Sequence, residues 1–290
     1  MSGFVIPDAE YERLVSYYTR DITALDRAGK YDPISGRDKE LEQMTLILLQ
    51  RLRKNVILLG SAGVGKTALF TGFSQKVNAG AVPRMLQGAR LIELDMSMIG
   101  AGSQSRAELE GRLIPLIKGA AERNATRQNP PIIYFIDEFH QLMITFKASS
   151  YSGIADLLKP YLTAGNLFIV GATTREEFED YVRVDPALDR RFQKVFLDEP
   201  DLHTTLAILR GLKGNFESHY GLTVAPESCA RIVKLTDRYI PKRTNPDKSI
   251  LALDLACAWA VKKGIEGELD QQSIDAAIAS EAGVDVQAIR

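Results

Sequence analysis

The feature that most constrains the fold is a glycine-rich octapeptide between a short apolar run and a stretch with helical spacing. It reads Gly60-Ser61-Ala62-Gly63-Val64-Gly65-Lys66-Thr67 and fits the pattern G-x-x-x-x-G-K-[ST]. The apolar run covers 55–60, and the helical stretch covers 67–76. Glycines let backbone N–H groups turn toward phosphates, and the following helix presents the positive end of its dipole. The octapeptide therefore predicts a phosphate-binding loop between a buried strand and a helix.

Four further apolar runs predict a buried parallel sheet. They cover residues 91–96, 132–137, 167–171 and 194–197. Runs that are apolar on both faces are typical of strands covered by helices on each side, and the gaps between these runs are long enough for helical crossovers. We therefore expect an α/β fold, with a three-layer αβα domain and a five-stranded parallel sheet.

The pattern changes near the end of the last apolar run. From there on, apolar residues recur at helical spacing and no strand pattern returns. We expect two domains. A large nucleotide-binding domain covers 1–199 and begins with an N-terminal helix over 8–30, and a small all-α lid domain covers 200–290.

An acidic pair at the end of one apolar run predicts metal binding and hydrolysis. The third run, 132–137, ends in Asp137, and Glu138 follows it directly. Lys66 is expected to reach the outer phosphates of ATP, while Thr67 and Asp137 hold Mg²⁺. Glu138 is expected to act as the catalytic base or to orient the attacking water. His140 follows closely, but a single histidine beside a packed strand is more often structural, so we assign it no catalytic role.

Composition narrows the class of protein further. The chain of 290 residues has 36 basic and 37 acidic side chains, so its net charge of -1 gives no general attraction to nucleic acid or anionic membrane. It has no long apolar segment and no signal-peptide pattern, which predicts a cytoplasmic protein without membrane insertion. Cys229 and Cys257 lie in apolar helical patterns, which favours two buried thiols over a disulfide.

Beyond the phosphate loop, the chain resembles the Clp-type AAA+ chaperones, and in particular the first ATPase module of ClpA, ClpB and ClpC. The similarity extends from about Tyr18 to the C-terminus. The motifs that carry it stand at 19–21, 32–38, 60–67, 95–96, 135–138, 171–174, 187–192, 208–213 and 239–248. The resemblance implies an ATP-hydrolysing, Mg²⁺-dependent ring, with six copies as the family expectation, that remodels a protein partner or assembly.

The resemblance also implies nucleotide contacts that spacing alone would not give. Ile34, Ser35 and Gly36 are similar to the segment that lies against the adenine. Pro246 and Asp247 are similar to the lid residues that close over it from the other side. We therefore expect both segments to contribute to the ATP site.

Three further residues resemble catalytic positions of the family. Thr174 is similar to the polar sensor that contacts the outer phosphate or the attacking water. Arg190 and Arg191 look like paired arginine fingers that reach the nucleotide of the neighbouring subunit, a task that suits guanidinium groups. If they act in this way, each active site is shared by two subunits, and a head-to-tail contact that closes makes a ring.

The sequence departs from the family at the loop that grips a threaded polypeptide. Ser105 stands where threading members carry an aromatic residue, usually tyrosine. A serine offers little apolar surface, so we expect remodelling without tyrosine-based threading through the pore. Pro115 is expected to kink the supporting helix or to shorten its first turns. Phe146 and Tyr151 stand in a second loop and could substitute, although ordinary loop aromatics are the favoured interpretation.

Two other classes of function stay open. One is a nucleic-acid-handling AAA+ ATPase of the loader or initiator type, for which the small basic clusters 51–54 and 242–243 are the sequence support. The other is a nucleotide-gated structural component of a secretion or assembly machine. Retention of Glu138 and the arginine pair weighs against that second class. The start at Met1 favours a natural single-module protein over a fragment.

Overall fold

The computed structural model describes residues 5–103, 105–126, 130–144 and 155–289. Contacts between residues divide the chain into two units. The first comprises Met1–Tyr31, Lys39–Leu59 and Lys66–Phe196, and the second comprises Asp32–Asp38, Gly60–Gly65 and Leu197–Arg290. The phosphate loop up to Gly65 is thus grouped with the C-terminal part of the chain. The predicted boundary between residues 199 and 200 stays a prediction.

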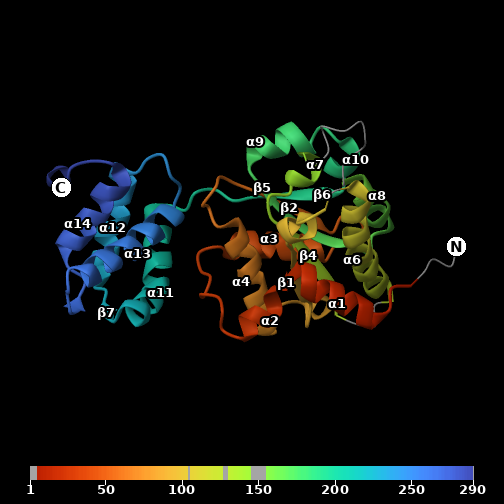
Figure 1. The fold of residues 1–290 in the computed structure, drawn as a ribbon, viewed down its shortest axis with the longest axis horizontal. Coiled ribbons are helices and arrows are strands. Elements are labelled where there is room, and N and C mark those ends of the chain that lie inside the picture. The colour runs from red at the N-terminus through yellow and green to blue at the C-terminus, as the bar shows by residue number, and fades with distance from the viewer. Residues whose placement is uncertain (1–4, 104, 127–129, 145–154, 290) are drawn as a thin grey trace. The chain divides into compact units, whose positions relative to one another are not determined.

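A six-stranded sheet forms the centre of the first unit, with the strand order β1-β3-β4-β5-β2-β6 (Figure 1). Five of its strands coincide with the five predicted runs and pair in parallel: β2 (Asn55–Leu59), β3 (Arg90–Leu94), β4 (Ile132–Ile136), β5 (Phe168–Thr173) and β6 (Phe192–Phe196). The sixth, β1 (Thr19–Asp21), pairs antiparallel with β3. The predicted parallel sheet is therefore confirmed, and it has one additional antiparallel edge strand.

Helices cover both faces of this sheet, which confirms the three-layer αβα arrangement (Figure 1). On one face lie α2 (Ile22–Arg27) and α4 (Lys66–Asn78), and the ring of Phe70 on α4 stacks on that of Phe135 of β4 at 4.6 Å. On the other face lie α1 (Asp8–Tyr18), α6 (Arg106–Thr126) and α8 (Ala155–Ala164). The remaining helical segments are α3 (Asp38–Leu48), η1 (Arg84–Leu86), α5 (Met96–Gly100), α7 (Gln141–Ile144), α9 (Arg175–Glu177), η2 (Phe178–Val182) and α10 (Pro186–Asp189).

The prediction of one N-terminal helix over 8–30 is wrong, because α1, β1 and α2 occupy this segment. Thr19 ends α1 in an extended conformation (φ -142°), and its hydroxyl donates to the carbonyl oxygen of Val15 at 2.5 Å. Asp21 begins α2 by accepting a hydrogen bond from the backbone N–H of Ala24 at 2.9 Å. Side chains that bind nearby backbone groups in this way compete with a continuous helix.

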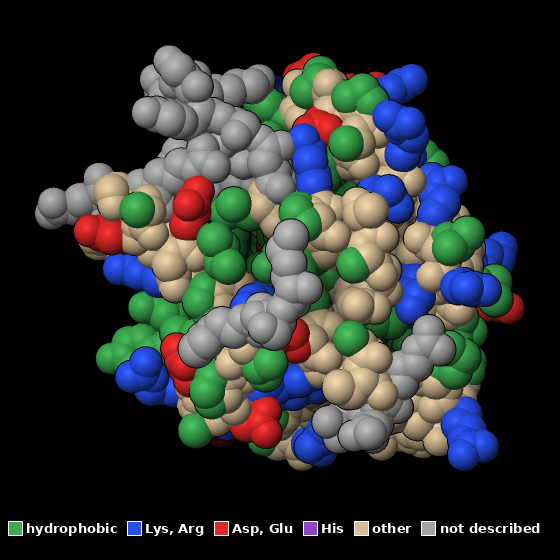
Figure 2. All heavy atoms as spheres, turned by 90° about the vertical axis from the view of Figure 1, so that its right-hand side faces the viewer, with side chains coloured by type: hydrophobic (Ala, Val, Ile, Leu, Met, Phe, Trp, Pro, Cys, Tyr) green, Lys and Arg blue, Asp and Glu red, His purple; other side chains and the backbone are tan. Residues whose placement is uncertain are grey.

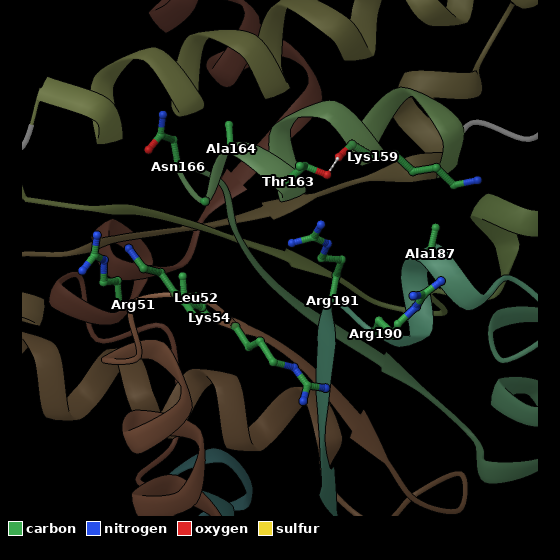
Figure 3. Close-up of a pocket in the computed structure, with 12 residues that line it drawn as sticks. Arg51, Leu52, Lys54, Lys159, Thr163, Ala164, Asn166, Ala187, Arg190 and Arg191 are labelled. Atoms are coloured by element: carbon green, nitrogen blue, oxygen red, sulfur yellow. Dashed lines mark hydrogen bonds between the residues drawn. The ribbon is translucent and has the colours of Figure 1, made fainter.

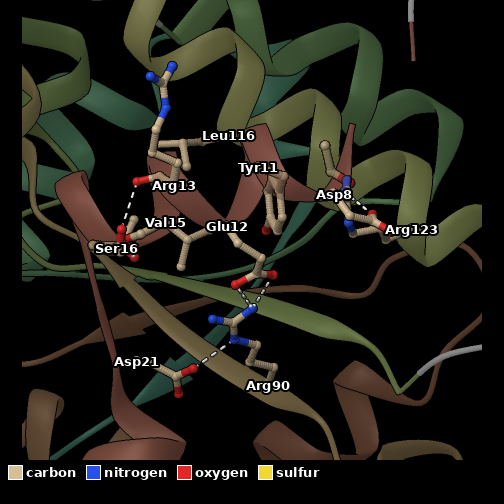
Figure 4. A network of polar contacts seen from close by, with 12 residues as sticks. Asp8, Tyr11, Glu12, Arg13, Val15, Ser16, Asp21, Arg90, Leu116 and Arg123 are labelled. Atoms are coloured by element: carbon tan, nitrogen blue, oxygen red, sulfur yellow. Dashed lines mark hydrogen bonds and ion pairs between the residues drawn. The ribbon is translucent and has the colours of Figure 1, made fainter. Parts of the chain in front are cut away.

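Polar contacts fix α1 to the edge of the sheet (Figure 4). Arg90 of β3 donates from Nη1 to Oε1 of Glu12 at 2.7 Å. The fully buried Tyr11 hydroxyl lies 2.8 Å from that of Tyr134, which donates its own hydrogen to the carbonyl of Leu116. Tyr11 is therefore the donor of this pair. Burial raises the pKa of Tyr11 to about 12.

The helix that carries Pro115 is not shortened, so that part of the prediction is wrong. Helix α6 begins at Arg106 and runs for 21 residues through the proline. Proline removes the N–H that would bond to the carbonyl of Gly111, four residues earlier. Because Gly111 is exposed, water can satisfy its carbonyl group, and the helix continues.

The second unit contains four long helices: α11 (Leu202–Tyr220), α12 (Pro226–Tyr239), α13 (Asp247–Lys262) and α14 (Gln271–Ala282). It also has a short 3-10 turn, η3 (Val286–Ala288), and a parallel pair of two-residue strands that the all-α prediction omitted, β7 (Leu222–Thr223) and β8 (Gly267–Glu268). Cys229 and Cys257 are free and buried, as predicted. None of the described helices has the length and apolar character needed to span a membrane.

Candidate active site

The phosphate loop joins β2 to α4, as the sequence predicts. Gly63 and Gly65 have φ angles of +77° and +97°, which residues with a side chain rarely adopt. Lys66 begins α4 and is only 8% exposed. This burial lowers the pKa of its ammonium group, and the carboxylates of Asp137 and Glu138 oppose the shift. The loop therefore has the backbone freedom and the cation that phosphate binding requires.

The two predicted metal ligands meet in the structure. The hydroxyl of Thr67, on the first turn of α4, donates to Oδ2 of Asp137 at 2.9 Å. Asp137 directly follows β4. A hydroxyl and a carboxylate are hard oxygen ligands of the kind that Mg²⁺ binds together with phosphate oxygens and water. The donor set at this position fits Mg²⁺.

Glu138 has an unusual backbone conformation. It is the one described non-glycine residue with a positive φ, at +49°. Such a conformation costs about 1–3 kcal/mol and is most often found at functional sites. The Glu138 carboxylate is 49% exposed, and the backbone N–H of Glu138 donates to Oδ1 of Asp137 at 3.0 Å. The chain thus tolerates strain to present this carboxylate beside Asp137, the predicted metal ligand.

A buried histidine lies beside Glu138, in a group that we call the Glu138 cluster: Glu138, His140, Thr173 and Glu177. The Nδ1 atom of His140 lies 3.0 Å from Oγ1 of Thr173, 3.2 Å from Oε2 of Glu177 and 3.6 Å from Oε2 of Glu138. The Thr173 hydroxyl donates to Oε2 of Glu177 at 2.8 Å. Sequence reasoning gave His140 no catalytic role and missed Thr173 and Glu177.

The predicted sensor Thr174 begins helix α9. Its hydroxyl accepts from the backbone N–H of Glu177 at 3.2 Å, and its own backbone N–H donates to Oε2 of Glu177 at 2.9 Å. Burial raises the pKa of Glu177, but the hydrogen bonds that its carboxylate accepts from the backbone N–H of Thr174 and from the hydroxyls of Thr173 and Thr174 lower it overall. The sensor role of Thr174 stays a prediction.

The predicted adenine segments belong to the second unit, together with the phosphate loop up to Gly65. A Cβ atom added at Gly63 would lie 2.8 Å from Cβ of Asp247, and one added at Gly36 would lie 2.9 Å from Cγ2 of Thr204 on α11. The structure thus brings the loop close to the predicted lid residue Asp247 and packs the 32–38 segment on α11. Ile34 and Ser35 share that segment, and Pro246 precedes α13.

Sequence reasoning missed Arg37, which directly follows the predicted adenine segment. Its side chain is buried, and Nη2 donates to the carbonyl oxygens of Val64 and Asp198 at 2.8 and 3.1 Å. Arg37 therefore holds the backbone of the phosphate loop in place. The only sequence signal for Arg37 is its position directly after Gly36, and this signal is weak because arginine side chains are mostly exposed.

Arg190 and Arg191 line a pocket of about 730 Å³ in the first unit, and its cationic lining consists of Arg51, Arg53, Lys54, Lys159, Arg190 and Arg191. We call it the cationic pocket. Figure 3 shows Arg191 extending toward the middle of the pocket while Arg190 lies beside Ala187. Within the described part of the chain, the guanidinium groups of Arg51, Arg53 and Arg191 have no hydrogen-bond or ion-pair partner. On the face drawn in Figure 2, basic side chains gather toward the right, with few acidic ones among them.

The fold and the site define a class of protein. A glycine-rich phosphate loop after one strand of a parallel sheet, with an aspartate that is a predicted metal ligand after another, is the arrangement of P-loop nucleotide hydrolases. The family description "ATPase family associated with various cellular activities (AAA)" matches residues 56–199, and "AAA lid domain" matches 201–283. The chain belongs to the AAA family of ATPases.

Individual relatives refine this assignment. The chain is 41% identical over 252 residues to chaperone protein ClpB of Gloeobacter violaceus, which covers 87% of this chain and 28% of the relative. It is 41% identical over 258 residues to the AAA+ ATPase ClpV1 of Pseudomonas aeruginosa, covering 89% of this chain and 28% of the relative. The resemblance to Clp-type AAA+ chaperones is confirmed, and the chain spans little more than a quarter of the length of these relatives.

Solved structures agree with the sequence relatives. A structure of Hsp104 with ATPγS and FITC-casein superposes with a TM-score of 0.86 at 34% identity, covering 96% of this chain and 47% of that one. The Saccharomyces cerevisiae Hsp104–ADP complex gives a TM-score of 0.85 at 34% identity, covering 95% of this chain and 46% of that one. The fold of the present chain is therefore that of about half of an Hsp104 subunit.

Proposed function

We propose that this chain hydrolyses ATP with Mg²⁺, that its copies assemble into a ring, and that the ring remodels a protein partner. One observation carries the hydrolysis part of the proposal. After the carboxyl end of β2 come the buried Lys66 and the hydroxyl of Thr67, and after that of β4 come Asp137 and Glu138. The Thr67 hydroxyl donates to the Asp137 carboxylate, and Glu138 presents its exposed carboxylate from a strained backbone. Parallel strands have their carboxyl ends at the same edge of a sheet, where such sheets bind nucleotides.

Each of these groups has a distinct task in phosphoryl transfer. The Lys66 ammonium neutralises charge on the outer phosphates, and Thr67 and Asp137 hold Mg²⁺ with their oxygen atoms. Mg²⁺, when bound, neutralises the charge that develops on the phosphate oxygens. The Glu138 carboxylate accepts a hydrogen bond from the attacking water and orients it. Phosphoryl transfer depends mainly on positioning and charge stabilisation, so Glu138 need not be a strong base.

The Glu138→Gln variant tests this assignment. It removes the negative charge and keeps the size of the side chain, so we expect ATP binding to persist while turnover is lost. The matched control is Glu176→Gln, at an exposed position of α9, which should turn over normally. Equilibrium binding of a fluorescent ATP analogue and steady-state phosphate release measure the two effects separately. Normal turnover by the Glu138→Gln protein would remove the proposed role.

The cationic pocket supports the proposal that Arg190 and Arg191 act on the nucleotide of a neighbouring copy. Several guanidinium groups without carboxylate partners gather there, and such groups suit the oxygens of a polyphosphate. Replacing both arginines by alanine should lower hydrolysis about 10³-fold with little change in ATP binding. A sharper test mixes this double variant with the Glu138→Gln protein, each inactive alone.

The mixture distinguishes shared from self-contained sites. If arginines act across subunits, random mixing in equal amounts makes about one interface in four complete, and activity should return to roughly a quarter of the wild-type value. If each subunit contains its whole active site, the mixture stays as inactive as its components. A rate per copy that is unchanged when the wild-type protein is diluted to monomers would contradict the ring as well.

The remodelling part of the proposal comes from the relatives. One of the Hsp104 structures contains casein, and we extend a protein substrate to this chain by similarity, with six copies as the expected ring. Ser105 is exposed, and its hydroxyl accepts from the backbone N–H of Glu108 at 3.3 Å at the start of α6. This position supports remodelling without tyrosine-based threading, and a Ser105→Tyr variant that does not change the unfolding of a casein substrate would count against it. Phe146 and Tyr151 lie outside the described residues.

The Glu138→Gln protein, incubated with ATP, can be used to capture the partner and so to distinguish a protein partner from a nucleic acid. A bound protein supports remodelling, whereas salt-sensitive capture of DNA would favour the nucleic-acid class. The relatives and solved structures reported above give no support to the nucleic-acid or structural alternatives. A cytoplasmic location is part of the same proposal and rests on the two free, buried cysteines.

A further inference from the structure

The Glu138 cluster contains a buried side chain to which the proposed mechanism gives no task. We propose that His140 is a positioning residue for hydrolysis: its Nδ1–H group is a fixed donor, anchored by Thr173 and Glu177, that orients the Glu138 carboxylate. This inference rests on the proposed role of Glu138, and the first of the two experiments below does not depend on that role.

The hydrogen bonds of the cluster determine where the imidazole proton lies. The Thr173 hydroxyl has a single hydrogen, and it points to Oε2 of Glu177 at 2.8 Å. Oγ1 of Thr173 can therefore only accept in its 3.0 Å contact with Nδ1 of His140. Nδ1 must carry the proton. A nitrogen that carries this proton cannot bind a metal ion at the same time, so the assignment argues against a cation site at Glu138, His140 and Glu177, whose ligand atoms lie close together.

Within the cluster, the donor is buried and one of its neighbours is half exposed. The His140 side chain is 9% exposed, and its ring lies beside that of Tyr181, with the centroids 6.0 Å apart. Glu177 is fixed by the hydroxyl of Thr173 and the backbone N–H of Thr174. Glu138 is 49% exposed, and its Oε2 lies 3.6 Å from Nδ1, slightly beyond hydrogen-bond distance.

This difference in burial assigns the roles. The single Nδ1 hydrogen, which points to Oγ1 of Thr173, can be shared with a second acceptor. A shift of less than 1 Å in the Glu138 side chain would let its carboxylate accept this hydrogen in a bifurcated, charge-assisted bond, and such bonds restrict the orientation of a carboxylate. Oε2 of Glu177 accepts from the backbone N–H of Thr174 and also faces Nδ1 of His140. His140 is therefore a common neighbour of Glu177, in the first turn of α9, and of the Glu138 carboxylate. Movement at the end of β5 would therefore change the orientation of Glu138.

The protonation state of His140 can be measured directly by NMR. The chain has three histidines, so ¹⁵N-labelled protein gives three imidazole patterns in a long-range ¹H–¹⁵N spectrum. The variants His203→Gln and His219→Gln assign the other two by loss of their signals. We expect a proton on Nδ1 of His140 in the nucleotide-free protein. A neutral imidazole that carries its proton on Nε2 instead would overturn the proposal, whatever Glu138 does.

Kinetics test the positioning role itself. His140→Ala should lower kcat by about 10- to 100-fold, while the Kd for ATP stays within about twofold, because orientation of the nucleophile is lost but the phosphate loop is intact. His140→Asn should recover part of kcat, since the asparagine amide nitrogen stands near the position of Nδ1. His140→Gln, which places its amide nearer Nε2, should not.

The control is His219→Ala, on α11, which should match the wild-type kcat. An unchanged kcat in His140→Ala, or equal recovery by Asn and Gln, would overturn the positioning role. If His140→Ala unfolds, the Asn and Gln variants and the NMR measurement still decide the question. Normal turnover by Glu138→Gln together with a protonated Nδ1 would remove the proposed function and leave the hydrogen-bond assignment intact.

Discussion

A substitution at Gly171, in the middle of β5, tests how closely the side chains next to the active site are packed. A Cβ atom at this position would lie 2.7 Å from Cδ1 of Ile57 and 2.7 Å from Cδ2 of Phe139. Carbon atoms in contact normally stand about 3.5–4.0 Å apart, so Gly171→Ala requires a shift of roughly 1 Å. The end of the isoleucine side chain can rotate away, but the phenylalanine ring cannot move as freely.

Phe139 is fixed from several sides. Its ring is fully buried and meets that of Phe192 edge-on, with the centroids 4.9 Å apart. Its backbone N–H donates to the carbonyl of Ala172 at 2.8 Å. Overpacking of this kind costs about 1–3 kcal/mol, which lowers the melting temperature of a chain of this size by roughly 2–5 °C. Since Phe139 lies between Glu138 and His140 in the chain, we also expect kcat to fall by about 10²-fold, as for a 1 Å misplacement of a catalytic group.

The same substitution at Gly214 is the matched control. Gly214 is exposed within α11, and a Cβ atom there would have no neighbour within 4 Å. Alanine should therefore stabilise the helix by about 0.5–1 kcal/mol and leave turnover unchanged. Thermal unfolding followed by calorimetry and steady-state phosphate release give both quantities. A Gly171→Ala protein that melts like the wild type would refute the packing argument, and one that melts lower but turns over normally would refute its connection to Glu138.

Three further changes test other parts of the structure. Lys66→Ala should abolish tight ATP binding, whereas Lys76→Ala at the other end of α4 should leave the Kd unchanged; equal affinities would contradict the phosphate role. Asp137→Asn should raise the Mg²⁺ concentration for half-maximal hydrolysis at least about tenfold, and an unshifted titration would exclude it as a ligand. Burial raises the pKa of Tyr11 from near 10 to about 12, so the unfolded chain loses a proton in this window that the folded chain keeps, and stability falls as pH rises through it. Urea unfolding should show that Tyr11→Phe loses less stability above pH 10 than the wild type. An equal loss of stability in the two proteins would contradict the raised pKa of the buried Tyr11 hydroxyl.

Most of the sheet could be predicted from the sequence because its parallel strands are apolar on both faces. The run 132–136 is an example, since all five of its residues are buried. The edge strand β1 could not be predicted in this way. It has only three residues, Thr19, Arg20 and Asp21, all polar and none fully buried, so no hydrophobic pattern marks it. Its place is set by pairing with β3 and by side chains that end one helix and begin the next.

The site was predictable where its residues are close together in the sequence. The phosphate loop and the pair Asp137 and Glu138 are contiguous motifs, and spacing alone indicates their chemistry. His140 and Glu177 are 37 positions apart, and only the pairing of β4 with β5 brings them together. Arg37 likewise reaches the loop from a distant segment, so its contact with Val64 depends on tertiary structure.

The left-handed backbone at Glu138 has a consequence for how this chain responds to selection. A glycine at this position would adopt the same conformation without strain. It would therefore raise the free energy of unfolding by roughly 1 kcal/mol. A library sorted only for resistance to heat should therefore accumulate glycine at residue 138, whereas one sorted for turnover should retain the carboxylate. The most active and the most thermally stable variants of this protein would therefore carry different residues at position 138.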